Sequence, residues 1–175
     1  MRNHRGPPAE SSAENYRAAH SLKGALMVDL LDELFRLHGR VQAAMRHNAE
    51  GTGLSPPMSI LLATIVCSAT PPTVPRIARA LGQSRQAVQR TADQLVSEGY
   101  VRWETNPEHR RAQLLVPTEL GARTFDRANA SSAVWADRVV ADLEQATLES
   151  TLVALRSIRH NLERSARGEE QGAAA

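Results

Sequence analysis

The residues best suited to chemistry in this chain are arginine and glutamine side chains gathered just after Ser84. Arg85, Gln86, Gln89 and Arg90 all follow that serine closely. An arginine can donate two parallel hydrogen bonds to guanine, and a glutamine amide can both donate to and accept from adenine. This pattern is typical of a surface that reads base edges in duplex DNA.

A helix that begins after Ser84 would present these side chains together. Val88, Ala92 and Leu95 recur at helical spacing and form an inward face opposite the polar one. Ser84 is a suitable N-cap, and Gly99 is a suitable stop. The N-terminus of such a helix can also meet a phosphate group.

The segment before this helix has the pattern of a first, shorter helix and a turn. Thr73 is an N-cap candidate, and Pro75 is tolerated in the first turn. Ala78 is small where two helices must approach closely, and Gly82 allows the chain to turn. The two helices and the turn predict a helix-turn-helix.

A two-stranded hairpin is expected after the second helix. Residues 100–105 contain alternating β-branched and aromatic side chains, and residues 113–116 form the returning strand. The tip between the strands carries the side chains His109, Arg110 and Arg111 in succession. We therefore predict a winged helix-turn-helix over about residues 55–120. Trp103 is expected to be the main packing residue of the hairpin, and the alternative is that it approaches DNA.

Long helices are predicted on both sides of this domain. Apolar residues recur at steps of three and four between positions 13 and 48. A helix of about 35 residues would be about 50 Å long, more than a small domain can cover, so we expect a second copy of the chain to cover part of it. A helix from Glu119 to about Leu143 and a final apolar stripe from Leu148 to Leu162 follow, with no Gly or Pro to mark their boundary.

The expected fold class is mainly α with a minor β part (α+β minor), with long N- and C-terminal dimerisation helices. The expected division comprises the following segments: 1–12, a flexible tail; 13–50, a dimerisation helix; 51–120, the DNA-binding domain; 121–165, dimerisation helices; and 166–175, a second tail.

Charge is concentrated where the helix-turn-helix is predicted. The chain has a net charge of only +2, but residues 73–111 hold seven arginines against four acidic residues. Residues 118–167 carry seven basic and seven acidic side chains. A localised positive excess is what a DNA-binding surface requires.

Several other classes of protein are not favoured by the sequence. Cys67 is the only cysteine, the six histidines show no metal-ligand spacing, and no nucleophile–base set emerges. We expect no metal, no cofactor and no enzyme activity. No apolar run is long enough for a signal peptide or a membrane span, which favours a cytoplasmic protein without a membrane partner.

The ordered set of motifs resembles the MarR family of bacterial regulators. The matching segments are GLSPP at 53–57, IARALGQS at 77–84, Val88 and Leu95, GYV at 99–101, and RRAQLLVPT at 110–118 with Gly121. The resemblance covers about residues 20–163. No single motif is decisive, but the ordered set is fairly specific.

The resemblance implies a homodimer whose body is made by the first helix and the last two helices of both chains. It places Ser84, Arg85, Gln86, Gln89 and Arg90 in the major groove of a pseudo-palindromic operator. The wing residues His109, Arg110 and Arg111 would lie at the minor groove or the DNA backbone. Family members usually repress genes and release DNA when a small molecule binds.

The sequence departs from the family at the wing. The family commonly has an aspartate directly before the first wing arginine, and this chain has His109 there. Glu108 is an alternative partner for Arg110; otherwise that arginine is freer. A further alternative is that Arg110 and Arg111 are only solubilising charges.

A small hydrophobic or aromatic effector would bind between the first, second and fifth helices. Residues that could line such a pocket are Phe35, His38, Met58, Leu62 and Trp135. Each of them is also suited to ordinary packing, Trp135 at a dimer interface. Two other functions stay open: a winged helix used only for protein interaction or dimerisation, and a redox-sensing regulator that uses Cys67.

Overall fold

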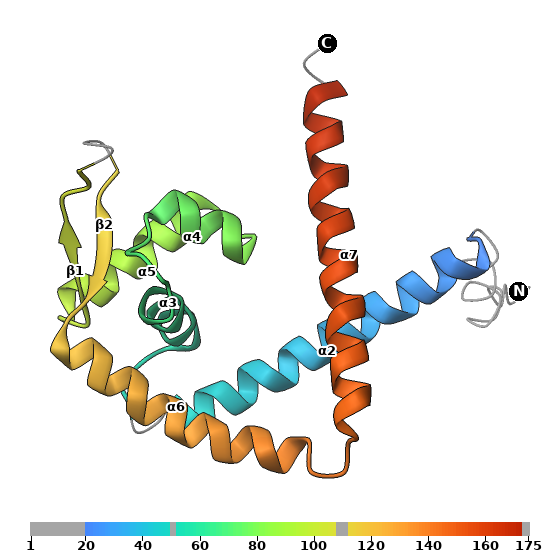
Figure 1. The fold of residues 1–175 in the computed structure, drawn as a ribbon, viewed down its shortest axis with the longest axis horizontal. Helices are drawn as coiled ribbons and strands as arrows, with labels where there is room; N and C mark the ends of the chain where they lie inside the picture. Colours follow the sequence, from blue (N-terminus) through green and yellow to red (C-terminus); the bar gives the residue numbers. More distant parts are fainter. Residues whose placement is uncertain (1–19, 50–51, 108–111, 173–175) are drawn as a thin grey trace, which may run out of the picture. The chain divides into compact units, whose positions relative to one another are not determined.

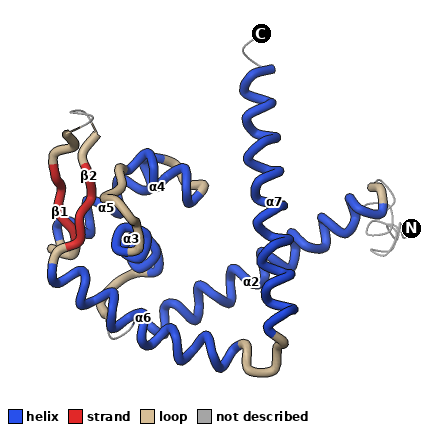
Figure 2. Tube along the Cα trace, viewed as in Figure 1, coloured by secondary structure: helices blue, strands red, loops and turns tan. Residues whose placement is uncertain are grey.

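The computed structural model describes residues 20–49, 52–107 and 112–172 (Figure 1). The chain divides into two compact units, residues 1–128 and 129–175, and each is treated by itself. Figure 2 shows that helices dominate and that the strands form one short hairpin. The elements in chain order are α2 (Leu22–Ala49), α3 (Pro56–Val66), α4 (Val74–Leu81), α5 (Arg85–Ser97), β1 (Val101–Glu104), β2 (Leu114–Pro117), α6 (Glu119–Val139) and α7 (Gln145–Gly172). The predicted class, mainly α with a minor β part, is confirmed.

Helix α2 begins at Leu22, later than the sequence pattern predicts. The Ser21 hydroxyl accepts a hydrogen bond from the backbone N–H of Gly24 at 3.2 Å, which satisfies one of the free donors at a helix start. Residues 13–19, where we expected the first turns, lie outside the described residues. Large apolar side chains on this helix are exposed in the single chain, Leu22 at 81% and Phe35 at 76%.

The core of the first unit lies among α3, α4, α5 and the hairpin. Helix α3 packs against α5 and β2, and α4 packs against α5. Helix α3 is apolar around most of its surface, and it buries Met58, Leu61, Leu62 and Ile65. Burial of these aliphatic side chains, at about 1.5–3 kcal/mol each, is the main force that holds the helices together.

The predicted turn between α4 and α5 is confirmed. Gly82 has a φ of +63°, a left-handed conformation that favours glycine, and the N–H of Gln83 donates to the Ala78 carbonyl at 2.9 Å. The Ser84 hydroxyl accepts from the N–H of Ala87 at 3.2 Å and caps α5. The position at which α5 starts is therefore set by the local sequence.

Strands β1 and β2 form the predicted antiparallel hairpin, with Trp103 opposite Leu115 and Val101 opposite Pro117. A third segment, just before α4, pairs with β2. The N–H of Leu115 donates to the Pro72 carbonyl at 2.9 Å, next to a bridge between Thr73 and Leu114. The sequence did not predict this third segment, which attaches the wing to the start of α4.

The second unit contains the later part of α6 and helix α7. Helix α6 ends at Val139, earlier than the predicted Leu143. The chain turns directly after it, and the Leu143 N–H donates a hydrogen bond to the Val140 carbonyl at 2.9 Å. Helix α7 continues to Gly172, into the segment that the sequence predicts as a tail. Its apolar side chains include Leu152 and Leu162, both of which are exposed in the single chain.

Candidate nucleic-acid interface

Helix α5 has one buried and one exposed face. Val88, Ala92 and Leu95 are buried in the core of the first unit. The opposite face, together with the cap, is exposed and consists of the residues that the sequence singles out: Ser84, Arg85, Gln86, Gln89 and Arg90. Their roles toward DNA stay predictions, but their exposure makes them available to a partner.

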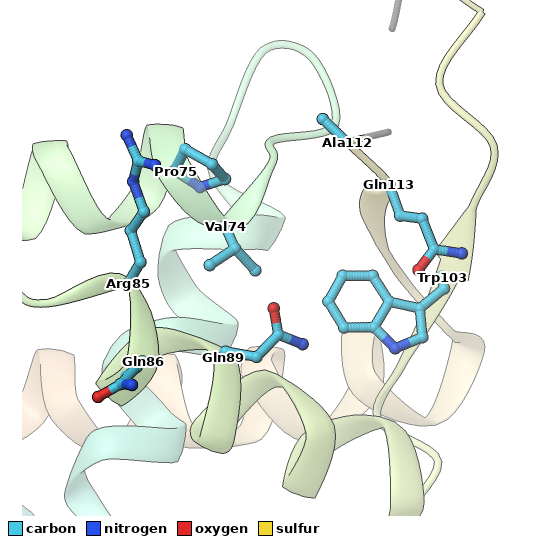
Figure 3. Close-up of a pocket in the computed structure, with 8 residues that line it drawn as sticks. All are labelled: Val74, Pro75, Arg85, Gln86, Gln89, Trp103, Ala112 and Gln113. Atoms are coloured by element: carbon cyan, nitrogen blue, oxygen red, sulfur yellow. The ribbon is translucent and has the colours of Figure 1, made fainter. Parts of the chain in front are cut away.

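Three of these side chains lie beside a cleft between α5 and the wing, here called the α5–wing cleft. Its volume is about 390 Å³. In Figure 3 the Gln89 side chain points toward the Trp103 indole, and Arg85 extends alongside Pro75. The lining residues are Val74, Pro75, Arg85, Gln86, Gln89, Trp103, Ala112 and Gln113.

Trp103 has two roles in this geometry. It is partly buried and packs against the core, but the fully buried residues of the hairpin are Val101 and Leu115, so the prediction of Trp103 as the main packing residue is wrong. The same side chain also lines the α5–wing cleft, opposite the start of α4 at Val74. Its indole therefore contributes both to the core and to the wall of the cleft.

The sequence reasoning missed Gln113. This exposed residue lies just before β2 and lines the α5–wing cleft. The strand alternation contains the signal, because Leu115 is fully buried against the core and Gln113 precedes it by two residues. Residues two apart in an extended chain share a face, so the spacing of Gln113 from Leu115 could have indicated that its side chain lies on the side of the wing that faces α5.

Some of the described arginine side chains of the winged helix already have a partner within the chain, and others do not. Arg102 is ion-paired with Glu104 and donates to the Pro117 carbonyl at 3.3 Å, and Arg76 donates to the Thr70 hydroxyl at 3.1 Å. Among the described residues, the Arg85 and Arg90 guanidinium groups have neither an ion pair nor a hydrogen bond. These two are thus the arginines of α5 that are ready to meet an anionic or base-edge partner.

The wing tip was predicted to carry the basic residues that approach DNA. His109, Arg110, Arg111 and the alternative partner Glu108 all lie outside the described residues. Their predicted contacts with the minor groove or the backbone therefore stay predictions.

The residues expected to bind an effector have three different surroundings in the structure. Phe35 and His38 line an apolar hollow on α2 with neighbouring leucines and Val41. Met58 and Leu62 are instead 1% exposed in the core of the first unit, because α3 is buried on most sides. Trp135 belongs to the second unit, where it is partly buried.

The described residues also bear on metal, thiol and membrane functions. Within the described ranges, no three His, Cys, Asp or Glu side chains gather as metal ligands. Cys67 is a free, exposed thiol at the C-cap of α3. None of the helices in the described part of the chain has both the length and the apolar character needed to cross a membrane.

Fold and surface together define a winged helix-turn-helix with a polar, arginine- and glutamine-bearing second helix. A sequence model described as MarR family matches residues 52–112, which include α3, α4, α5 and β1. Residues 52–112 are therefore similar to the MarR family, and the fold of the chain is that of MarR-family transcription regulators.

Solved structures extend this likeness beyond the winged helix. A MarR-family transcriptional regulator from Rhodococcus sp. RHA1 aligns at 25% identity with a TM-score of 0.67, over 76% of this chain and 94% of that chain. CouR from Rhodococcus jostii RHA1, bound to p-coumaroyl-CoA, aligns at 25% identity with a TM-score of 0.69, over 74% and 91%. The repressor CouR bound to a 23-mer DNA duplex aligns at 25% identity with a TM-score of 0.67, over 80% and 99%.

Among curated sequences, an uncharacterized protein of Mycobacterium tuberculosis is 40% identical over 84 residues. The matched segment is 48% of this chain and 59% of that protein. A Mycobacterium bovis protein matches with the same identity and coverage. This chain thus spans less than two thirds of the length of these relatives.

Proposed function

We propose that this protein is a sequence-specific DNA-binding transcriptional regulator that acts as a homodimer. The observation that carries the proposal is the exposed start of α5. Arg85, Gln86 and Gln89 lie there beside the α5–wing cleft, and the Arg85 and Arg90 guanidinium groups are unpaired among the described residues. Recognition helices insert their first turns into the major groove, where such side chains can read base edges.

The DNA-bound structure of CouR supports this proposal, because a relative with 25% identity over 80% of this chain binds a 23-mer duplex. The exposed apolar side chains support the dimer. Leu22 on α2 and Leu152 and Leu162 on α7 would be covered by a second copy. Two-fold symmetry then predicts a pseudo-palindromic operator with half-sites about one helical turn apart.

The first experiment is to isolate bound duplexes from a random pool and to measure their affinity at several salt concentrations. Binding through several phosphate contacts should weaken about a thousandfold between about 50 and 200 mM salt. If no duplex is selected, or if affinity does not depend on salt, the protein is better explained as a protein-interaction or dimerisation module.

A matched pair of variants tests the role of α5. Arg85→Ala should relax the preference at one base pair and cost about 1–3 kcal/mol of binding free energy. Arg36→Ala removes the same charge from α2, where Arg36 is ion-paired with Asp32 at 2.8 Å, and should leave base preference unchanged. Equal effects of the two changes would contradict the assignment of α5 as the reading helix.

We further propose that the protein is a repressor released by a small aromatic or apolar ligand. The p-coumaroyl-CoA complex of CouR supports a search among aromatic acids and their CoA thioesters. Phe35 and His38 in the apolar hollow on α2 are the candidate contacts. Fluorescence anisotropy of a labelled operator should fall when the effector is added, and Phe35→Ala should weaken that response without weakening DNA binding.

A further inference from the structure

An acidic side chain lies on the exposed face of α5, next to the residues that face the α5–wing cleft. The Nε2 of Gln89 donates a hydrogen bond to Oδ1 of Asp93 at 2.9 Å, one helical turn further along. Both residues are exposed, and Gln89 itself lines the cleft. An acidic group here repels phosphate, so general affinity for DNA does not explain its presence.

The hydrogen bond restricts what Gln89 can present to a partner. A glutamine amide has two N–H donors and one carbonyl acceptor, and rotation of the amide exchanges their positions. An ionised carboxylate only accepts hydrogen bonds, so it stabilises the orientation that turns Nε2 toward Asp93. The opposite orientation would bring the Gln89 carbonyl oxygen against the negative carboxylate.

In the favoured orientation, Gln89 keeps one N–H and its carbonyl oxygen for another partner. One donor beside one acceptor complements the major-groove edge of adenine, which offers the N6 amino group and the N7 acceptor. Guanine offers two acceptors, O6 and N7, and the Gln89 carbonyl oxygen would oppose one of them. An amide held in this way therefore discriminates better than one that rotates freely.

We infer that Asp93 is a positioning residue that orients the Gln89 amide and thereby sets base preference at the position Gln89 reads, in favour of adenine. This inference rests on the proposed function, because it requires α5 to enter a DNA groove. Asp93 itself need not contact DNA. Its negative charge lowers affinity for all sequences, in exchange for selectivity at one base pair.

The same helix provides a matched control. Gln94 donates to Glu98 at 3.0 Å with the same spacing and also on the surface, but neither residue lines the α5–wing cleft. Pairs of this kind contribute little to helix stability. Glu98→Ala removes an equal charge and an equivalent hydrogen bond without changing a side chain that faces the cleft.

The test uses the full chain and the duplex selected for it, with every base pair of one half-site replaced in turn. Asp93→Ala should reduce the preference for one base over the others at least about fivefold at a single base pair. Gln89→Ala should reduce the preference at that same base pair. The double variant should lose no more discrimination than Gln89→Ala alone, because both changes remove one interaction. Glu98→Ala should shift affinity for all duplexes alike.

Other outcomes would overturn the inference and leave the proposed function intact. One is that Asp93→Ala raises the affinity for all duplexes equally, as Glu98→Ala does, while the base preference at the position read by Gln89 stays unchanged. Another is that Gln89→Ala has no base-specific effect while salt-dependent binding persists. If the unaltered protein binds no duplex at all, both the proposed function and the inference fail. Thermal melts of each variant show that the fold is retained.

Discussion

The carbonyl oxygen of Tyr100 occupies the space in which residue 121 would carry a side chain. An ideal Cβ built on Gly121 would lie 1.9 Å from that oxygen, far inside van der Waals contact. The start of α6 is held there by Thr118, whose hydroxyl donates to the Gly99 carbonyl at 2.6 Å and accepts from the Gly121 N–H at 3.1 Å. The end of α5 and the start of α6 thus form one tightly packed joint.

Gly121→Ala should therefore destabilise the protein. The obstructing atom belongs to the backbone, so the helix start must move, and we expect a loss of about 1–3 kcal/mol or more in the free energy of unfolding. Urea denaturation measures this loss. Gly39→Ala is the control, because nothing lies within 4 Å of its Cβ position on α2, and it should stabilise by about 0.5–1 kcal/mol. Similar effects of the two changes would contradict the close contact.

Ser84→Ala should remove the cap of α5 and cost about 1 kcal/mol of stability, because the N–H of Ala87 then loses its hydrogen-bond acceptor. Ser55 also occupies an N-cap position, but its side chain makes no capping hydrogen bond. Ser55→Ala should cost clearly less in the same denaturation experiment. A larger loss for Ser55→Ala would mean that the cap assignments are reversed.

Trp103 should report occupation of the α5–wing cleft. The chain has two tryptophans, so Trp135→Phe leaves Trp103 as the single emitter. Because its indole faces Gln89 across the cleft, addition of the selected duplex should change its emission intensity or wavelength. In the reciprocal variant Trp103→Phe, the remaining tryptophan emission should change less when the duplex is added. An unchanged Trp103 signal at saturating duplex would show that DNA does not approach this cleft.

The protein should have a solution mass of twice the chain mass of 19.1 kDa in analytical ultracentrifugation. Leu162→Glu on α7 should raise the dissociation constant of the dimer at least about tenfold, because an exposed leucine that a second copy covers loses its apolar contact in both chains. Asn161→Glu adds the same charge at the neighbouring exposed position and should have a smaller effect. A monomeric protein at micromolar concentration would contradict the dimer.

The helix-turn-helix was predictable from the sequence because its signals are local. The Ser84 cap, the left-handed turn at Gly82 and the buried spacing of Val88 and Leu95 each depend on residues within one or two turns of one another. The exposed arginine and glutamine residues of α5 follow directly from that periodicity. The hairpin was also predictable, because β-branched and aromatic side chains alternate with other residues along its first strand.

Contacts between distant segments decided the rest. The α5–wing cleft, the pairing of Pro72 with Leu115 and the approach of Tyr100 to Gly121 join residues far apart in the chain, and no periodic pattern encodes which of them meet. Met58 and Leu62 lie in the core, which agrees with the ordinary packing that the sequence also allowed for them. Local sequence determines which face of each element is apolar; only packing determines which partner covers that face.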